Sequence, residues 1–338
     1  MNKNILFLFL FIPSLLFSQK NDYIVNISES NKNKEEDQYR DNIRLTEEQQ
    51  FIKNNFPFIP LCRLSKGHKF TTTNKLGNSK FILQEKNTTE ITYIYEINNK
   101  IFYFQSIDTV RISLNRPGIF KTLLHFNFVS SDNLYYYYEY DGSIYDSCNP
   151  ENKLDGLVFL NDVDKARELL LGKTLYINTD IWNIDDDETY SGKKYVPVKI
   201  INIGICENRI GLYKFIFTYN DNKEYYIDVR LSGTNDYIED YKLILYSDTN
   251  PTFDKIFSFK DPRLKYPKIS SINWKLIQRG EVKIGMTKNE CELSYGYPNR
   301  VNETSNKYGK YEQWIYDYSI GGNIYLYFKN GILTTIQN

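Results

Sequence analysis

The sequence has few of the residues from which catalytic metal and redox sites are built. Its 338 residues include two histidines, His68 and His125, and four cysteines. No two cysteines form a Cys-x-x-Cys pair, and no His-Glu-x-x-His motif occurs. Zinc and dithiol redox sites are normally recognised by such spacings. We therefore expect no metal, no cofactor and no catalytic residue, and we interpret the chain as non-enzymatic.

Two weak catalytic patterns remain. Cys62 with His68 or His125 would give a thiol–imidazole pair, the arrangement of a cell-wall hydrolase, but neither histidine lies in a recognisable nucleophile context. The run Ser191-Gly192-Lys193-Lys194 matches the Ser-x-x-Lys pattern of serine acyl enzymes. Its companion motifs are missing, so we interpret it as a solvated loop.

The chain also lacks an excess of charge of either sign. Lys and Arg total 42, and Asp and Glu total 42. Binding to phosphate backbones requires a cationic surplus or stripe, so we predict no nucleic-acid partner. After the N-terminal residues no segment approaches the ~20 apolar residues that span a bilayer. We therefore expect that the chain is not an integral membrane protein.

The first 18 residues have the pattern of a secretory signal. Lys3 supplies positive charge, and residues 5–17 form an apolar run that is too short for an anchor. Cleavage is expected near Ser18. The first cysteine is Cys62, so no lipid-bearing cysteine stands near that point. We predict a periplasmic or secreted mature protein.

An exported protein folds in an oxidising compartment, which bears on its four cysteines. Four cysteines allow three pairings. Disulfides and buried thiols are both open for these residues, which are Cys62, Cys148, Cys206 and Cys291.

Aromatic residues are abundant, with 30 Tyr and 21 Phe. Tyr and Phe favour strands, which predicts a mainly β chain with some α+β character. An apolar-polar alternation at Ile91, Tyr93, Tyr95 and Ile97 is typical of a half-buried strand.

Two stretches of the chain repeat one pattern. Phe126-Asn127-Phe128, Asp132-Asn133 and Tyr136-Tyr137 recur 89 residues later as Phe215-Ile216-Phe217, Asp221-Asn222 and Tyr225-Tyr226. This pattern predicts a β-hairpin used twice. Upstream, Gly67-His68-Lys69-Phe70 resembles Gly172-Lys173-Thr174-Leu175, and Lys100-Ile101 resembles Lys194-Tyr195 more loosely.

Helix signals lie before, between and after these repeats. Thr46 and Gln49 form a capping box, and Pro57 ends that helix. Asp162 is expected to cap a helix that stops at Gly172. Near the C-terminus, Ser270 or Ser271 caps one helix. Thr287 and Glu290 form a capping box for a second helix, which stops at Gly296. Three strands follow, the last two joined by Asn330-Gly331, a strong hairpin signal.

Two families resemble parts of the chain. The Gly-x-x-apolar strand starts and the repeated Asp-Asn hairpins make residues 61–240 resemble tandem bacterial SH3-like barrels. Residues 268–338 resemble the BamE (small protein A) family of bacterial envelope domains, whose shape is shared with β-lactamase inhibitor proteins. That resemblance rests on Ile284-Gly285-Met286-Thr287, Gly296-Tyr297-Pro298, Trp314-Ile315-Tyr316 and the stretch from Tyr325 to Gly331. BamE is a lipoprotein of the outer-membrane assembly machine, whereas the lipid-bearing cysteine is absent here.

The expected organisation is a signal peptide (1–18), a polar and helical segment of unassigned role (19–60), two SH3-like barrels (61–150 and 160–240), a connector (241–267) and a domain of two helices and three strands (268–338). These resemblances imply a cell-envelope setting. They lead to two hypotheses: a binding or scaffold protein for cell-wall glycan or an envelope protein, and a secreted inhibitor that uses the C-terminal sheet.

Exposed aromatic rings on strands are the candidate contacts, because aromatic side chains dominate binding hot spots. On one strand, Tyr135 and Tyr137 face one side and Tyr136 and Tyr138 the other. The predicted binding residues are Tyr136, Tyr138, Trp314, Tyr316, Tyr325 and Tyr327.

Overall fold

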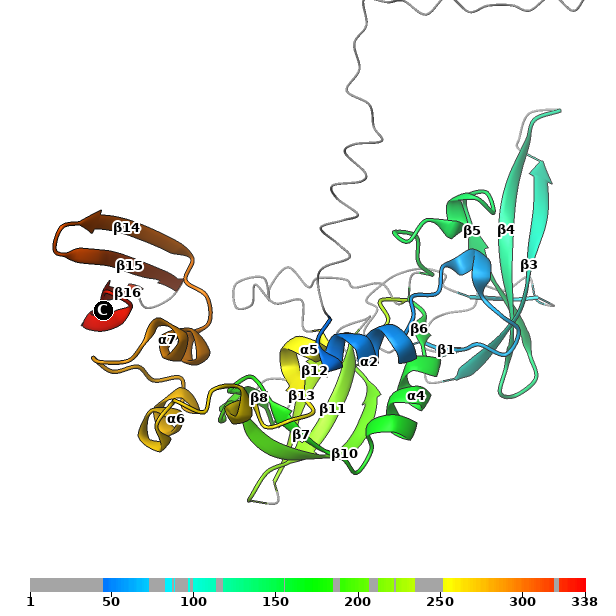
Figure 1. Ribbon diagram of the computed structural model, residues 1–338. Coiled ribbons are helices and arrows are strands. Elements are labelled where there is room, and N and C mark those ends of the chain that lie inside the picture. Colours follow the sequence, from blue (N-terminus) through cyan, green and yellow to red (C-terminus); the bar gives the residue numbers. More distant parts are fainter. Residues whose placement is uncertain are drawn as a thin grey trace, which may run out of the picture. The chain divides into compact units, whose positions relative to one another are not determined.

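The computed structural model describes residues 45–338 except 73–82, 87, 89–96, 98–99, 114–117, 155, 185–188, 207–211, 222, 235–251 and 319–321. The predicted signal peptide and most of the alternating stretch around Tyr93 lie outside the described residues. Within them the chain is mainly β, as predicted, with three antiparallel sheets and a few short helices (Figure 1). No helix in this part of the chain is long and apolar enough to cross a membrane.

The first sheet has the strand order β2-β5-β4-β3-β1-β6. Its long hairpin of β3 and β4 is prominent in Figure 1. The core on one side of the sheet is rich in phenylalanine, including Phe102, Phe126 and Phe128. The strands are β1 Lys69–Thr71, β2 Gln84–Glu85, β3 Ile101–Ser113, β4 Phe120–Ser130, β5 Tyr135–Tyr140 and β6 Val158–Phe159.

The second sheet has the order β13-β7-β10-β11-β12-β8-β9. Its core includes Trp182, Phe215 and Phe217. The strands are β7 Thr174–Ile177, β8 Ile181–Asn183, β9 Thr189–Ser191, β10 Val196–Ile205, β11 Tyr213–Thr218, β12 Glu224–Val229 and β13 Phe257–Ser258.

The two sheets share one arrangement, which confirms the hairpin predicted twice from the sequence. Phe128 faces Tyr136 across β4 and β5, and Phe217 faces Tyr225 across β11 and β12. The 89-residue offset of the sequence is therefore also the offset of the strand register.

The bulge and the strand start that precede this hairpin are duplicated as well. The register of β3 against β4 shifts after Phe104, and that of β10 against β11 shifts after Ile200. Gly67 N–H donates to the Phe104 carbonyl at 2.8 Å, and Gly172 N–H donates to the Ile200 carbonyl at 2.8 Å. The match of Gly67 with Gly172 thus holds in space.

The looser match of Lys100 with Lys194 is wrong by two residues. Phe102 pairs with Phe70 and Val198 pairs with Leu175, so the residue equivalent to Lys100 is Val196. Lys194 and Tyr195 lie in the turn before β10, where Tyr195 has φ +56°.

A disulfide links Cys62 with Cys148, so this chain contains both a disulfide and buried thiols. It joins two short 3-10 helices, η1 Leu61–Arg63 and η2 Asp146–Cys148, at a Cα–Cα distance of 5.1 Å. Cys206 and Cys291 are buried thiols.

Helices before and after the repeats complete the second core. Helix α2 Glu47–Asn55 begins with the predicted capping box of Thr46 and Gln49. Phe51 on α2 packs on Phe253, at 5.4 Å between ring centroids. The role left open for residues 19–60 is thus, for α2, to cover the second core. Phe253 belongs to α5 Phe253–Ile256, which with β13 lies in the segment predicted as a connector. That segment therefore supplies core residues instead of only linking two domains.

Helix α4 Asn161–Leu170 connects the two copies, but Asp162 does not cap it as predicted. The helix starts two residues earlier, with Leu160 in the cap position and no side-chain cap. Asp162 is instead buried and accepts hydrogen bonds from the hydroxyls of Tyr213 (2.9 Å) and Ser232. Burial raises the pKa of Asp162 in spite of these bonds.

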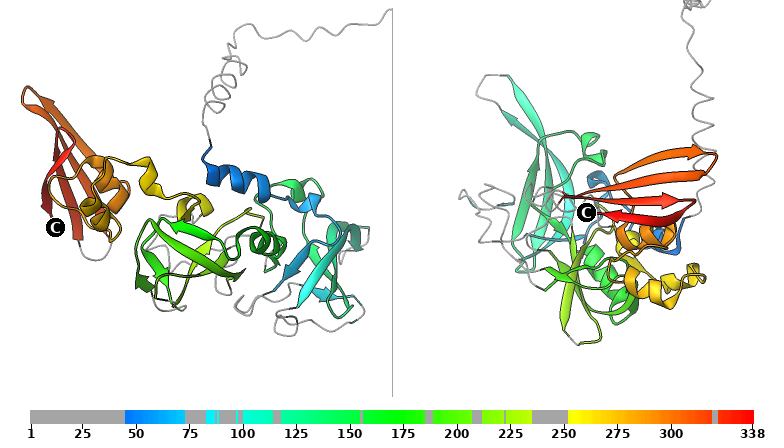
Figure 2. Two further views of the ribbon diagram at one scale, coloured as in Figure 1. Left: turned by 60° about the horizontal axis from the view of Figure 1, so that its bottom comes forward. Right: turned by 90° about the vertical axis from the view of Figure 1, so that its left-hand side faces the viewer.

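The C-terminal part has two helices followed by four strands, one strand more than predicted. Ser270 caps α6 Ser271–Ile277, and the predicted capping box of Thr287 and Glu290 starts α7 Lys288–Tyr295. Both helices cover one face of the sheet β14-β15-β16-β17 (Figure 2). The strands are β14 Arg300–Asn306, β15 Gly309–Tyr318, β16 Gly322–Lys329 and β17 Ile332–Gln337. The turn Asn330-Gly331 has φ +52° and +81°, as the sequence predicts.

Candidate binding face of the C-terminal sheet

The four-stranded sheet has an inner face that packs on α6 and α7. Side chains alternate along β15, so Glu312, Trp314 and Tyr316 all point toward the helices. Trp314 is 7% and Tyr316 3% exposed. The prediction that these two residues form a binding surface is wrong, because the sheet needs their rings for its own core.

The outer face of the sheet carries the other two predicted binding residues of this domain. Tyr325 and Tyr327 on β16 are both half-buried and point away from the helices. They lie beside Ile315 and Gln313 of β15, respectively. Tyr311 lies on the same face opposite Lys329, whose Nζ is 5.6 Å from the tyrosine ring centroid.

A chain of hydrogen bonds crosses this outer face and joins all four strands. Asn302 Nδ2 donates to Gln313 Oε1 (2.9 Å), and Gln313 Nε2 donates to the Tyr327 hydroxyl (3.0 Å). That hydroxyl donates to Gln337 Oε1 (2.9 Å). We call these four residues the amide–phenol ladder. It is uncharged, and the ion pair of Arg300 with Asp317 (3.3 Å) lies to one side of it.

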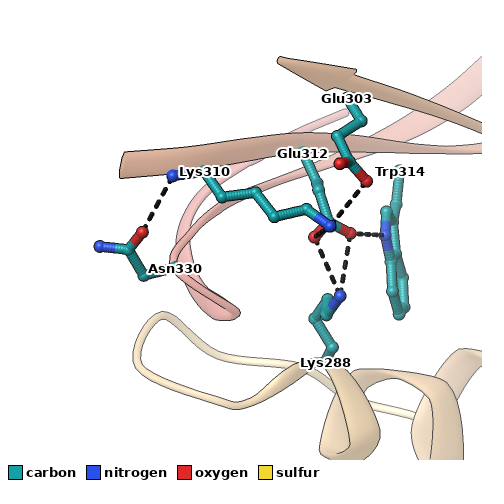
Figure 3. A network of polar contacts seen from close by, with 6 residues as sticks. All are labelled: Lys288, Glu303, Lys310, Glu312, Trp314 and Asn330. Carbon is teal, nitrogen blue, oxygen red and sulfur yellow. Dashed lines mark hydrogen bonds and ion pairs between the residues drawn. The ribbon is translucent and has the colours of Figure 1, made fainter. Parts of the chain in front are cut away.

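The inner face holds a charged network that fixes the sheet to α7 (Figure 3). The Glu312 carboxylate, 5% exposed, accepts two hydrogen bonds from Lys288 Nζ (2.9 and 3.1 Å) and one from Trp314 Nε1 (3.2 Å). Lys310 Nζ lies 3.6 Å from the same carboxylate and 2.8 Å from Glu303, and the Lys310 backbone N–H donates to Asn330 Oδ1 (2.9 Å).

Burial by itself would raise the pKa of Glu312. The hydrogen bonds from Lys288 and Trp314, together with the charges of Lys288 and Lys310, outweigh it and hold the pKa below its ordinary value. Glu312 is therefore an ionised structural carboxylate and not an acid available for proton transfer. The network anchors β15, the strand that supplies Gln313 to the opposite face.

In the first sheet the alternation of β5 is opposite to the one predicted. Tyr136 is 2% exposed and packs edge-on against Phe102, at 5.3 Å between ring centroids. Tyr138 is half-buried and packs on the same core. Tyr135 and Tyr137 are the residues that face outward. The pairing with β4 decides this, because Phe126 and Phe128 occupy the core opposite Tyr138 and Tyr136.

The structure therefore does not bring the six predicted residues together. Tyr325 and Tyr327 alone share an outward face. The sequence missed Asn302, Gln313 and Gln337, which join Tyr327 in the amide–phenol ladder. The period-two pattern of residues 311–317 contained the signal for Gln313. Strand β14, which supplies Asn302, is exposed along its whole length and has no apolar alternation to reveal it.

Two of the residues considered for catalysis, Cys62 and Lys194, have structural roles. Cys62 lies in the disulfide. Lys194 of the Ser-x-x-Lys pattern is not solvated as interpreted: its ammonium donates to the Ser294 carbonyl at the end of α7 and lies 3.7 Å from Asp180 Oδ1. Burial lowers the pKa of Lys194, and Asp180 opposes that shift. Among the described residues no three His, Cys, Asp or Glu side chains gather in a way suited to a metal ion.

The outer face can thus act by stacking and hydrogen bonding, through aromatic rings and amide groups held by a rigid sheet. Compared with protein-family models, curated proteins and solved structures, the chain matches none of them.

Proposed function

We propose that this chain is an exported, non-enzymatic binding or scaffold protein of a bacterial cell envelope, and that the outer face of the C-terminal sheet is its contact surface. The observation that carries the proposal is the amide–phenol ladder. It holds three amide side chains and a phenol in fixed positions across four strands. The partner is cell-wall glycan or an envelope protein, since both offer hydroxyl or amide groups that match such a face.

Export is supported by the signal-like N-terminal sequence and by the Cys62–Cys148 disulfide, a bond typical of oxidising compartments. We interpret the two duplicated sheets as SH3-like barrels and the C-terminal part as a BamE-like domain. The helix-helix-sheet order and the capped starts at Ser270 and Thr287 support the second interpretation. The duplicated strand order supports the first.

The test compares Tyr325→Ala with Tyr145→Ala in the exported chain. Tyr325 lies on the outer face opposite Gln337 and makes none of the ladder's hydrogen bonds, so its removal takes away a contact ring and leaves the ladder in place. Tyr145 is the control, because it is an exposed tyrosine directly before η2 and is far from the ladder in the sequence. Each variant is sedimented with purified cell-wall sacculi. In parallel, a photo-crosslinking group is placed at position 325 or 145 in living cells.

Saturable sedimentation that Tyr325→Ala abolishes and Tyr145→Ala retains identifies glycan as the partner. A discrete crosslinked protein at position 325 alone identifies an envelope protein. Equal behaviour of the two variants in both assays, or fractionation of the chain into the cytosol, contradicts the proposal.

The inhibitor hypothesis is favoured by one observation. Tyr308, in the turn between β14 and β15, is strongly exposed and has Lys307 Nζ 5.0 Å from its ring centroid. Such a hairpin tip is small enough to enter the cleft of another protein. Micromolar chain should then inhibit an envelope hydrolase or a β-lactamase, and Tyr308→Ala should relieve the inhibition. A panel left unaffected by the unmodified chain removes this candidate.

A further inference from the structure

The outward face of the first sheet carries six polar or aromatic residues in two cross-strand rows. One row consists of Ser106, Asn127 and Tyr137, and the other of Asp108, His125 and Glu139, with the middle residue of each on β4. We call this set the acceptor cluster. Ser106, Asp108 and Glu139 are exposed, whereas Asn127 is 5% exposed. We call the three exposed residues the rim of the cluster and the buried Asn127 its floor.

The hydrogen bonds of the cluster leave an oxygen of Asn127 unused. Asn127 Nδ2 donates to Asp108 Oδ2 (2.7 Å) and to Ser106 Oγ (3.0 Å). The carboxylate only accepts, which fixes the orientation of the amide. Asn127 Oδ1 is buried and has no hydrogen-bond partner among the residues that the structure describes. A buried acceptor in this state is unfavourable, because it has lost its water and gained no donor.

His125 shows the same deficit in the neighbouring row. Its ring stacks on Tyr137 with 4.2 Å between centroids and 19° between planes, and the Tyr137 hydroxyl donates to Gln84 Oε1 (2.8 Å). His125 Nε2 lies 3.6 Å from Glu139 Oε2. Within the described part of the chain this buried nitrogen makes no hydrogen bond.

The second copy of the fold shows that this strand arrangement does not require a polar residue at the position of Asn127. At the position of Asn127 it has Ile216, and at the position of Asp108 it has Gly204. The aromatic position is retained: Lys214 Nζ lies 4.1 Å from the ring centroid of Tyr226, as His125 lies on Tyr137. The same sheet therefore folds with an isoleucine where the first copy buries an amide with an unused oxygen.

We propose that the acceptor cluster is a binding site for a primary ammonium group, as carried by a small diamine or by a lysine-type side chain of a peptide. An ammonium offers three donors and no acceptor. The cluster offers the Asn127 oxygen and two carboxylates, Asp108 and Glu139, and contains no Lys or Arg. The acidic groups of the rim attract the cation, and Asn127 supplies the neutral acceptor. This site is independent of the ladder on the C-terminal sheet.

The test follows the Asn127 side-chain amide and the His125 ring by NMR in the full mature chain. The probes are cadaverine and the tripeptide Gly-Lys-Gly, and the control probe is the same tripeptide with its lysine amine acetylated. Both amines should give saturable shifts at millimolar concentrations, and the acetylated peptide should give none. The tighter of the two amine probes assigns the source of the ammonium group, small molecule or peptide.

Two variants decide the assignment. Asn127→Ile introduces the residue of the second copy and should abolish the shift of His125. Asp108→Asn keeps the shape of the side chain and should weaken binding by about tenfold, because a charged acceptor is replaced by a neutral one. If Asn127→Ile fails to fold, Asp108→Asn alone carries the test. Unsaturable shifts, equal binding of the acetylated peptide, or affinity unchanged in Asp108→Asn would overturn the proposal.

Discussion

Tyr137 and Tyr226 occupy equivalent positions in the two copies of one strand arrangement, and each ring has a basic side chain on its face. The equivalence extends from the glycine before the first strand, through the bulge, to the hairpin. The described residues between Gly67 and Val229 therefore contain one structural module twice, and each copy can be compared directly with the other.

The duplicated glycines offer a direct check of this equivalence. Gly67 has φ +92° and Gly172 has φ +78°. The Cβ of an alanine at either position would have no heavy atom of another residue within 4 Å, so the substitution causes no clash. The left-handed backbone alone should cost about 1 kcal/mol in each variant. Chemical denaturation should show equal losses for Gly67→Ala and Gly172→Ala. Gly204→Ala, in open space without a positive φ, should be near neutral. Unequal losses would contradict the equivalence.

The disulfide predicts a thiol count and a stability change. Denatured mature chain should react at two thiols before reduction and at four after it, since Cys206 and Cys291 carry the thiols. The cross-link spans 86 residues, and its loss in Cys62→Ser/Cys148→Ser should cost about 4 kcal/mol. The same comparison in reductant should show little difference. Four reactive thiols in the unreduced exported protein would refute the pairing.

Glu312 should make stability dependent on pH in the acid range. Its folded pKa is lowered from the ordinary 4.5, so its contribution is fully present above pH 4.5 and is lost as pH falls through the folded pKa. At neutral pH, Glu312→Gln should cost about 1–2 kcal/mol, and the difference from the unmodified chain should shrink in acid.

The matched control is Glu303→Gln, which removes an exposed partner of the same Lys310. It should change stability by less than about 0.5 kcal/mol. Urea titrations across the acid range measure the stability of both variants. A stability difference between Glu312→Gln and the unmodified chain that grows on acidification would contradict the predicted pH dependence.

Lys194 and its neighbour Lys193 differ in one respect that mutagenesis can isolate. Lys194 donates to the Ser294 carbonyl in the last turn of α7 and is largely buried, whereas Lys193 is exposed. Lys194→Ala leaves the Ser294 carbonyl and Asp180 without their cation and should cost about 2 kcal/mol. Lys193→Ala should fall within about 0.5 kcal/mol of the unmodified chain. Thermal melts of the two variants compare them, and equal melting temperatures would remove the structural role of Lys194.

Local signals in the sequence were sufficient for several elements. The capping boxes at Thr46 and Thr287 and the Asn330-Gly331 turn depend on residues within a few positions, and each was predicted at its place. Features that depend on residues far away in the sequence could not be predicted in this way. Phe253 and Phe257 read as part of a connector because their burial depends on α2 and β7.

The candidate sites show the same division. Period-two alternation separates the two faces of a strand, but the partner strand decides which face is buried. Tyr136 was therefore predicted to be exposed, although Phe128 places it in the core. Strand β14 was missed because all its residues are exposed and its pairing with β15 leaves no apolar pattern. The unused oxygen of Asn127 depends on the bonds of its amide to Ser106 and Asp108 on a neighbouring strand, which no local pattern reveals.

The bond between Cys62 and Cys148 also determines what a single peptide cleavage does to the molecule. The polypeptide between them includes every strand of the first sheet except β6. A protease that cuts once in a loop of this stretch leaves two pieces that stay covalently attached, with both still carrying their strands. A clipped copy can thus keep its two pieces together.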